Sequence, residues 1–288
     1  MVSVVIPAFN EGPAIEQTIT EIKNVLNKNE TEHEIIIVDD GSSDETGEVA
    51  SKSGAIVVRN PHNMGYGFSL KRGIQKASND TIIITDADLT YPFEFVPAML
   101  EEKNKGFDLI VGNRTGKRTM GGPFKRLLRF FLKSVVEFVT EREIPDINSG
   151  LRVFDKHTVV EYFPRLCDTF SFSTSQTLAY MMNGKFVKYV DIPYNKRAGK
   201  SHVKLFKDSL KTLKYILEAC IYYNPLKVFT FMSLVCILLS ILGFLVSHFI
   251  GLKVGYLCGI GGLLVSILVF SMGMLATVLK QIMNKKDS

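Results

Sequence analysis

The sequence predicts an α/β protein, in which a mostly parallel sheet covered by helices is followed by amphipathic segments and a C-terminal transmembrane hairpin. Over the first 113 residues, short apolar runs alternate with stretches of helical periodicity. Two much longer apolar runs lie near the C-terminus, separated by only three residues. Strands that are apolar throughout are typical of parallel sheets buried on both faces, and their alternation with helices indicates a doubly covered, Rossmann-like sheet.

The strands and helices of the first half can be assigned in order. The predicted strands are residues 3–8, 34–39, 55–59, 81–86 and 108–113. The predicted helices are residues 12 to about 27, a short one from Asp44, then 65–77 and 92–105. Ile15, Ile19 and Ile22 give the first helix its apolar face. Ser42 or Ser43 is expected to cap the second helix. Residues 146–190 return to a mixed α/β pattern.

Acidic residues stand where two of these strands end. Asp39 and Asp40 close the second strand, and Asp86 and Asp88 close the fourth. Ligands of such sheets bind beyond the carboxyl ends of the strands. Two carboxylates two residues apart can hold a divalent cation, Mg²⁺ or Mn²⁺, which prefers oxygen ligands and bridges to phosphates. A D-x-D triplet also occurs in ordinary turns, so its place after a strand is what favours the metal site.

Basic residues gather next to apolar ones in two later segments. Residues 114–133 contain seven basic residues and no acidic one, with apolar residues at helical spacing, which indicates a helix lying in a membrane interface. An ordinary helix with a solvated basic face is the alternative. A second stripe, Lys204 to Lys214, also has an apolar face and leads into the long apolar runs. Because these stripes adjoin apolar segments, the net charge of +5 favours a lipid bilayer over nucleic acid as the partner.

The two long apolar runs cover residues 228–250 and 254–279, and each is long enough to cross the hydrocarbon core. Lysines flank the outer ends of the pair, so the positive-inside rule puts these ends, both termini and the α/β domain in the cytoplasm of a cell with the hairpin in its membrane. The predicted divisions are the α/β domain, 1–203, a juxtamembrane amphipathic helix, 204–223, and a transmembrane hairpin, 224–288. The alternative is a buried helical hairpin of a soluble protein.

Several motifs in this order resemble known enzymes. Val5-Ile6-Pro7-Ala8-Phe9-Asn10-Glu11, Val38-Asp39-Asp40-Gly41-Ser42 and Asp86-Ala87-Asp88-Leu89 are similar to segments of the family 2 glycosyltransferases. Gly112-Asn113-Arg114, Asp146-Ile147-Asn148-Ser149-Gly150-Leu151-Arg152 and Arg197-Ala198-Gly199-Lys200-Ser201 resemble the polyprenyl- and dolichyl-phosphate glycosyltransferases, the dolichyl-phosphate mannosyltransferase-like subgroup. The resemblance implies the GT-A fold, a nucleotide-sugar donor, a polyprenyl phosphate acceptor and an inverting mechanism.

The resemblance also implies roles for particular residues. The implied donor-nucleotide site is Pro7, Ala8, Asn10, Glu11, Asp39, Lys71, Asp86 and Ala87. The implied metal ligands are Asp86 and Asp88, and the implied catalytic residues are Asp88 and Arg114. The implied acceptor-phosphate site is Arg114, Arg126, Arg129, Arg197 and Ser201. Relatives often have glutamine and histidine after D-A-D-L, where this chain has Thr90 and Tyr91.

The transfer implied by the resemblance is of a hexose from a UDP-glucose-type donor to the lipid phosphate. An ionised phosphate is already a nucleophile and needs no general base. The alternatives are a GDP-mannose donor, a processive polysaccharide synthase and a non-catalytic membrane scaffold with the same fold. The synthase is disfavoured because its Q-x-x-R-W motif needs a tryptophan, and this chain has none. The sequence leaves open the sugar, the prenyl length and the oligomeric state, a homo-oligomer included.

Overall fold

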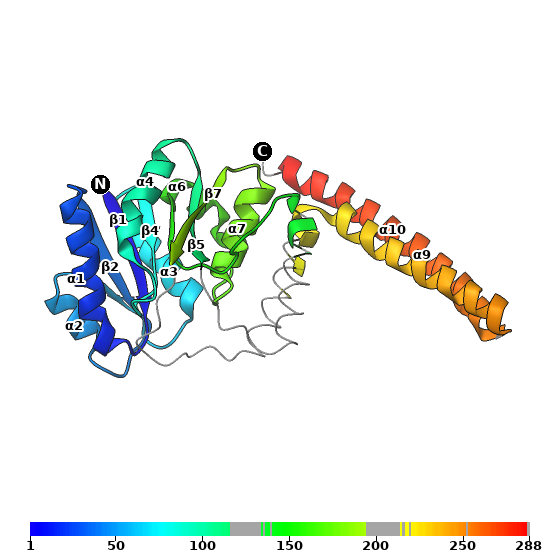
Figure 1. The fold of residues 1–288 in the computed structure, drawn as a ribbon, viewed down its shortest axis with the longest axis horizontal. Helices are drawn as coiled ribbons and strands as arrows, with labels where there is room; N and C mark the ends of the chain where they lie inside the picture. The colour runs from blue at the N-terminus through cyan, green and yellow to red at the C-terminus, as the bar shows by residue number, and fades with distance from the viewer. Residues whose placement is uncertain are drawn as a thin grey trace. The chain divides into compact units, whose positions relative to one another are not determined.

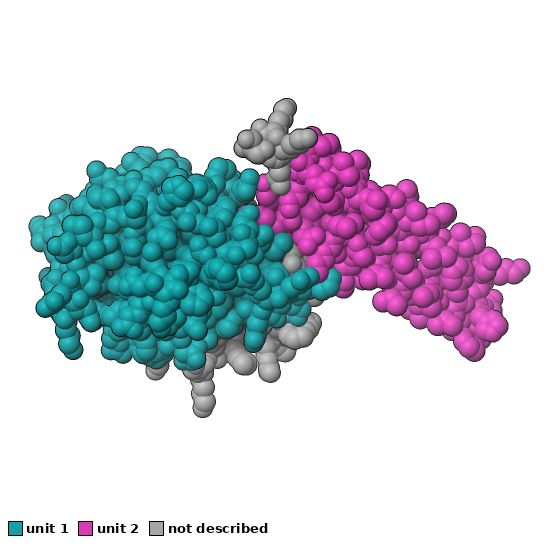
Figure 2. Space-filling model, turned by 90° about the horizontal axis from the view of Figure 1, so that it is seen from above, with its two compact units in different colours: residues 1–216 teal, residues 217–288 magenta. Residues whose placement is uncertain are grey.

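The computed structural model describes residues 1–115, 140–193, 220–251 and 253–286, together with 134, 136–138, 214 and 217–218. It divides into two compact units, residues 1–216 and 217–288, which are coloured separately in Figure 2. Arg126, Arg129, Arg197 and Ser201 lie outside the described residues. So does most of the two amphipathic segments predicted from sequence, 114–133 and 204–214.

The first unit is built on one seven-stranded sheet in the order β3-β2-β1-β4-β6-β5-β7 (Figure 1). The strands are β1 Val2–Ala8, β2 His33–Asp39, β3 Ile56–Arg59, β4 Thr81–Ile84, β5 Leu109–Thr115, β6 Arg152–Asp155 and β7 Val187–Pro193. Only β6 pairs antiparallel with its neighbours; the other pairings are parallel. The predicted mostly parallel α/β sheet is therefore confirmed. Strand β4 ends at Ile84, so Asp86 lies in the following loop and not in the strand as predicted.

The first four described helices of this unit follow the predicted order, and α6 and α7 fall in the stretch predicted only as mixed α/β. They are α1 Gly12–Lys28, α2 Thr46–Lys52, α3 Tyr66–Lys76, α4 Val96–Asn104, α6 Lys156–Tyr162 and α7 Phe172–Met182, with short 3-10 turns η1 Phe93–Phe95 and η2 Phe163–Arg165. The predicted serine cap of α2 is wrong. The helix begins at Thr46, whose backbone N–H donates to the Asp44 carboxylate at 3.1 Å, and the Ser42 hydroxyl instead accepts a hydrogen bond from the backbone N–H of Asn10.

Alternate residues of β1 are buried against helices on opposite faces of the sheet. Val4 and Ile6 belong to the apolar core formed with α1 and α4. Val5 points to the other face, where α3 lies so close that a Cβ at Gly73 would come within 2.4 Å of the Val5 side chain. Glycine at this position therefore lets α3 rest directly on β1 and β2. Burial on both faces explains why the strand is apolar throughout.

The second unit contains two long helices, α9 Pro225–Ile250 and α10 Lys253–Lys286, which pack side by side. Both are long and apolar enough to cross a membrane, with mean hydropathies of 2.6 and 2.3 in their most apolar windows. Gly251 ends α9 in the left-handed conformation, with φ of 74°, and permits the sharp reversal. The hairpin predicted from the two apolar runs thus has the helical form that a two-span membrane segment requires.

Small residues bring the two hairpin helices into close contact. A Cβ at Gly243 would lie 2.9 Å from the carbonyl oxygen of Gly255, so the backbones nearly touch there. The hydroxyl of Ser233 donates to the carbonyl oxygen of Ser266 at 2.9 Å, and that of Ser240 donates to the carbonyl of Gly259. Glycine contacts and serine hydrogen bonds are the interactions that hold helices together in lipid, where burial of apolar surface offers no driving force.

Candidate active site

The parallel strands bring the ends of four segments to one edge of the sheet. The loops that follow β1, β2 and β4 leave from this edge, and β5 ends there. Because β6 runs antiparallel, its first residue, Arg152, lies at the same edge, opposite Ile84 of β4 and Val111 of β5. Residues far apart in the sequence therefore meet beyond the carboxyl ends, where ligands of open α/β sheets bind.

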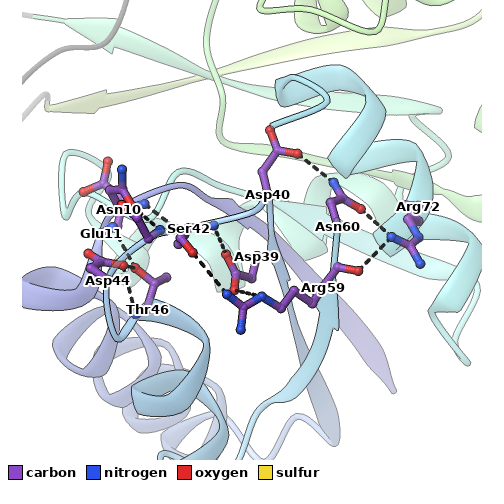
Figure 3. A network of polar contacts seen from close by, with 11 residues as sticks. Asn10, Glu11, Asp39, Asp40, Ser42, Asp44, Thr46, Arg59, Asn60 and Arg72 are labelled. Atoms are coloured by element: carbon purple, nitrogen blue, oxygen red, sulfur yellow. Dashed lines mark hydrogen bonds and ion pairs between the residues drawn. The ribbon is translucent and has the colours of Figure 1, made fainter. Parts of the chain in front are cut away.

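The loops after β1 and β2 are tied together by side-chain hydrogen bonds (Figure 3). Asn10 adopts a positive φ of 56° and accepts from the backbone N–H of Ser43 at 2.9 Å. The backbone N–H groups of Asn10 and Glu11 donate to the hydroxyls of Ser42 and Thr46 at 3.0 and 2.9 Å. Two residues of the predicted donor site, Asn10 and Glu11, are thus held in one rigid pair of loops.

Asp39 lies at the base of the same region and is only 1% exposed. One carboxylate oxygen accepts from the backbone N–H of Ser42 at 2.9 Å, and the other pairs with the Arg59 guanidinium at 3.4 Å. The Arg59 side chain is 64% exposed, so one end of this pair faces solvent. The prediction that Asp39 contacts the donor base or ribose stays a prediction, and Arg59 joins it as a group that sequence reasoning missed.

Asp40, the neighbour of Asp39, has a structural role. Its carboxylate accepts from the Asn60 amide at 2.7 Å and from the backbone N–H groups of Met64 and Gly65, each at 2.9 Å. Asp40 therefore fixes the turn that leads into α3. Gly65 has a φ of 106° at this point, a conformation that favours glycine.

Asp86 and Asp88 follow β4 in a tightly specified loop. Asp88 is buried, and one of its oxygens accepts from the backbone N–H and the hydroxyl of Thr90 at 3.1 and 2.5 Å. Asp86 accepts from the Tyr66 hydroxyl at 3.0 Å. A Cβ at Gly150 would lie 2.9 Å from the Asp86 carboxylate, so the 146–150 loop crosses directly over it. Each carboxylate thus has one oxygen oriented by a neighbouring hydroxyl.

This pair fits a divalent cation that is shared with a substrate. Among the residues that the structure describes, no three His, Cys, Asp or Glu side chains form a complete metal cluster. Mg²⁺ commonly takes only one or two protein carboxylates and completes its shell with phosphate oxygens and water. Asp86 and Asp88 have the oxygen chemistry for that arrangement, and they would hold the cation together with a diphosphate.

Arg114, near the end of β5, is held in a bidentate ion pair with Asp146. Its Nε and one terminal nitrogen donate to the two carboxylate oxygens at 2.6 and 2.9 Å. Asp146 is buried, whereas Arg114 is partly exposed. A guanidinium held by a buried carboxylate has a fixed orientation, and arginine is well suited to recognition of a phosphate.

Arg152 organises the loop that carries Asp146. The side chain is fully buried, and it donates to the backbone carbonyls of Ser149 and Ile147 at 2.7 and 3.0 Å. It also donates to Gln176 and Thr177 of α7 at 3.2 and 2.9 Å. Burial lowers the pKa of the Arg152 guanidinium from its ordinary value. Sequence reasoning assigned this arginine no role, although it ends the D-I-N-S-G-L-R motif.

Replacing Arg152 with methionine should destabilise the first unit by about 2–5 kcal/mol, because two loop carbonyls and two α7 side chains lose their buried donor. Thermal unfolding of the detergent-solubilised protein, followed by circular dichroism, would measure the loss. The control is Arg165→Met, which removes an exposed arginine of η2. An unchanged midpoint in the Arg152 variant would show that the buried cation does not hold the loop.

Lys71 is a predicted donor residue, and its place in the donor site stays a prediction. Its ammonium donates to the carbonyl oxygen of Leu166 at 2.5 Å and pairs with Asp168 at 2.7 Å. Pro7 and Ala8 lie at the end of β1, and Ala87 is buried between the two aspartates. Their assignment to the donor site stays a prediction.

Two tyrosines near the aspartates were not identified from the sequence as site residues. Burial, followed by the negative charge of Asp86, raises the pKa of Tyr66 well above its usual value. The same two causes raise the pKa of Tyr91, which Arg114 opposes, and the Tyr91 oxygen accepts from the backbone N–H of Gly150 at 2.7 Å. Both phenols stay protonated at neutral pH. The 146–150 loop links these groups, because Gly150 lies against Asp86 and donates to Tyr91, and Asp146 pairs with Arg114.

Comparisons with known proteins agree with this fold. A dolichyl-phosphate hexose transferase of Haloferax volcanii is 26% identical over 220 residues, covering 76% of this chain and 93% of that protein. A dolichol-phosphate mannosyltransferase of Pyrococcus furiosus is 31% identical over 204 residues, covering 67% of this chain but only 55% of its own length. An undecaprenyl-phosphate 4-deoxy-4-formamido-L-arabinose transferase of Photorhabdus laumondii is 27% identical over 266 residues, covering 85% and 74%.

Among solved structures, the fold is similar to that of glucosyl-3-phosphoglycerate synthase from Mycobacterium tuberculosis in complex with Mn²⁺, UDP-glucose and phosphoglyceric acid. The TM-score is 0.62 at 22% identity, with 76% of this chain and 79% of that one covered. The family model for glycosyl transferase family 2 matches residues 3–163, more than half of the chain, and this range includes β1 to β6 with the aspartate loop. The chain therefore belongs to glycosyl transferase family 2.

Proposed function

We propose that this protein is a metal-dependent glycosyltransferase that moves a hexose from a nucleotide sugar to a polyprenyl phosphate, with inversion at the anomeric carbon. The observation that carries the proposal is the opposition of charges at one sheet edge. Asp86 and Asp88 follow β4, and Arg114 stands near the end of β5. The 146–150 loop touches both groups, because Gly150 lies against the Asp86 carboxylate and Asp146 pairs with Arg114. The two aspartates suit a cation-bound diphosphate, and Arg114 suits an anionic acceptor.

In this mechanism the aspartates hold the donor and the arginine holds the acceptor. When bound, the cation would offset the charge that develops on the departing nucleoside diphosphate. Arg114, oriented by Asp146, would direct the acceptor phosphate to the face of the sugar opposite the leaving group. A phosphate monoester is ionised at neutral pH, so this chain needs no general base to activate it. Arg126, Arg129, Arg197 and Ser201 are proposed to complete the acceptor site.

The lipid nature of the acceptor is supported by the hairpin and by the relatives. Three relatives are named for transfer to dolichyl or undecaprenyl phosphates. The two apolar helices would keep the enzyme at the membrane, where such acceptors reside. Lys227, Lys280, Lys285 and Lys286 belong to the open end of the hairpin. By the positive-inside rule, this end and the catalytic unit are proposed to be cytoplasmic.

The donor is proposed to be of the UDP-glucose type, with GDP-mannose as the second candidate. The structural neighbour from Mycobacterium tuberculosis was solved with UDP-glucose and Mn²⁺, which favours the first. The relative from Pyrococcus furiosus is named a mannosyltransferase, which favours mannose.

A donor panel tests the proposal. The full-length protein in detergent is incubated with Mn²⁺, radiolabelled UDP-glucose or GDP-mannose, and undecaprenyl or dolichyl phosphate, and the lipids are then extracted. We expect one donor to label the lipid fraction and EDTA to prevent the labelling. Absence of labelled lipid in every arm would contradict the proposal, and label on a soluble phosphate ester would assign a different acceptor.

A further inference from the structure

We infer that Tyr66 is a positioning residue for the Asp86 carboxylate and that Phe170 holds the Tyr66 ring in place. The inference rests on the proposed function, in which Asp86 binds the cation, and it adds two residues from separate elements to that site. Neither residue belongs to a motif that the sequence analysis used.

The contact between Tyr66 and Asp86 links two strand-end loops. The Tyr66 hydroxyl donates to one carboxylate oxygen of Asp86 at 3.0 Å. Tyr66 is the first residue of α3, directly after Gly65, whose backbone N–H is fixed by the Asp40 carboxylate at 2.9 Å. The Asp40 carboxylate therefore fixes the backbone next to Tyr66. Because one of its oxygens accepts this hydrogen bond, the Asp86 carboxylate cannot rotate freely about its Cβ–Cγ bond.

Phe170 is stacked on the ring of Tyr66. The ring centroids are 5.7 Å apart and the planes differ by 19°. Phe170 itself is 50% exposed, so its ring is only partly covered by the protein. Stacked pairs contribute beyond the area that they bury, so the exposed ring restricts the phenol to the orientation that reaches Asp86.

The segment that carries Phe170 is itself fastened to α3. Lys71 donates to the Leu166 carbonyl and pairs with Asp168, and the backbone N–H of Phe68 donates to the Asp168 carbonyl at 3.0 Å. A Cβ at Gly67 would lie 2.1 Å from the carbonyl oxygen of Cys167, so only glycine lets the two segments approach this closely. The segments that carry Tyr66 and Phe170 are thus held together, although the two residues are more than 100 positions apart in the sequence.

A ligand carboxylate oriented by a second side chain binds metal more tightly than a freely rotating one. Loss of such an outer partner typically costs 10–100-fold in metal affinity. The Tyr66 hydroxyl satisfies one oxygen of Asp86 and leaves the direction of the other defined. The substitution Tyr66→Phe keeps the stacked ring and removes only this hydrogen bond.

The test is the Mn²⁺ dependence of nucleotide binding, measured without turnover. Labelled UDP and GDP are bound, in separate arms, to the full-length protein over a series of Mn²⁺ concentrations. Tyr66→Phe should raise the Mn²⁺ concentration for half-maximal binding about tenfold, with metal-free binding and the thermal midpoint unchanged. Tyr162→Phe is the matched control, because Tyr162 is a buried tyrosine of α6 that packs edge-on against Tyr180.

A double-mutant cycle tests the part played by Phe170. Phe170→Leu alone should raise the Mn²⁺ concentration for half-maximal binding, the Mn²⁺ midpoint, by about threefold. The same substitution should cause no further rise in the Tyr66→Phe background. Additive shifts, or a wild-type Mn²⁺ midpoint in Tyr66→Phe, would overturn the inference. If the wild-type protein binds neither nucleotide in a Mn²⁺-dependent manner, the proposed function itself fails, and that result is distinct from failure of the positioning role.

Discussion

Replacing Asp88 with asparagine should reduce sugar transfer by about 10²–10³-fold, the loss expected when one preorganised electrostatic contact is removed. Asparagine keeps an oxygen that can accept from Thr90, so the buried loop should remain folded. What disappears is the negative charge that would hold the cation against the diphosphate. The rate of labelled lipid formation, measured at saturating donor, gives the effect directly.

Asp80→Asn is the matched control for this experiment. Asp80 is exposed and lies directly before β4, whereas Asp88 is buried beyond the other end of the same strand. The control variant should keep wild-type activity. Near-normal transfer by Asp88→Asn, or full activity of the wild-type protein in EDTA, would refute the metal assignment.

Replacing Arg114 with alanine should reduce transfer by about 100-fold or more while leaving binding of the donor nucleotide nearly unchanged. The alanine variant also leaves the buried Asp146 carboxylate without its bidentate partner, so a loss of stability is expected as well. Arg114→Lys separates the two effects. Lysine keeps the charge beside Asp146 but cannot form the fork, so it should restore stability and only part of the activity.

The readouts for Arg114 are the initial rate with polyprenyl phosphate, the Mn²⁺-dependent binding of UDP or GDP, and the thermal midpoint. Arg165→Ala, at an exposed arginine outside the site, is the control. A lysine variant with the full wild-type rate would show that the guanidinium geometry is unimportant. Equal losses of donor binding and transfer would place Arg114 on the donor instead of the acceptor.

The fold was predictable from the sequence because its elements are strongly patterned. Strands β1, β2 and β4 are continuous apolar runs, and the helices between them have apolar faces at helical spacing. The hairpin was predictable because α9 and α10 contain almost no charge over a length that matches a bilayer. Strand β6 and its antiparallel direction were not predictable, because its pairing with β4 and β5 joins segments that are distant in the sequence.

The site was predictable only where chemistry is concentrated in a short motif. Asp86 and Asp88 stand in one triplet, and Asn10 and Glu11 are neighbours directly after the first strand, so their types and positions indicated the edge where they lie. The contacts from Tyr66 to Asp86 and from Arg152 to the 146–150 loop connect residues that only the folded sheet brings together. The different roles of Asp39 and Asp40 could not be predicted from the sequence for the same reason. The two residues are adjacent, but one faces the Arg59 pair and the other fixes the turn before α3.

The most direct measurement of the central claim compares a polyprenyl phosphate with the corresponding free prenol in otherwise identical vesicles. The purified protein is given the donor that labels lipid, and the product is identified by mass spectrometry. We predict that the phosphate is converted to a prenyl-phosphate hexose and that the prenol is not, because in the proposed mechanism Arg114 binds an anion and no general base activates a hydroxyl. Efficient transfer to the prenol would contradict the account.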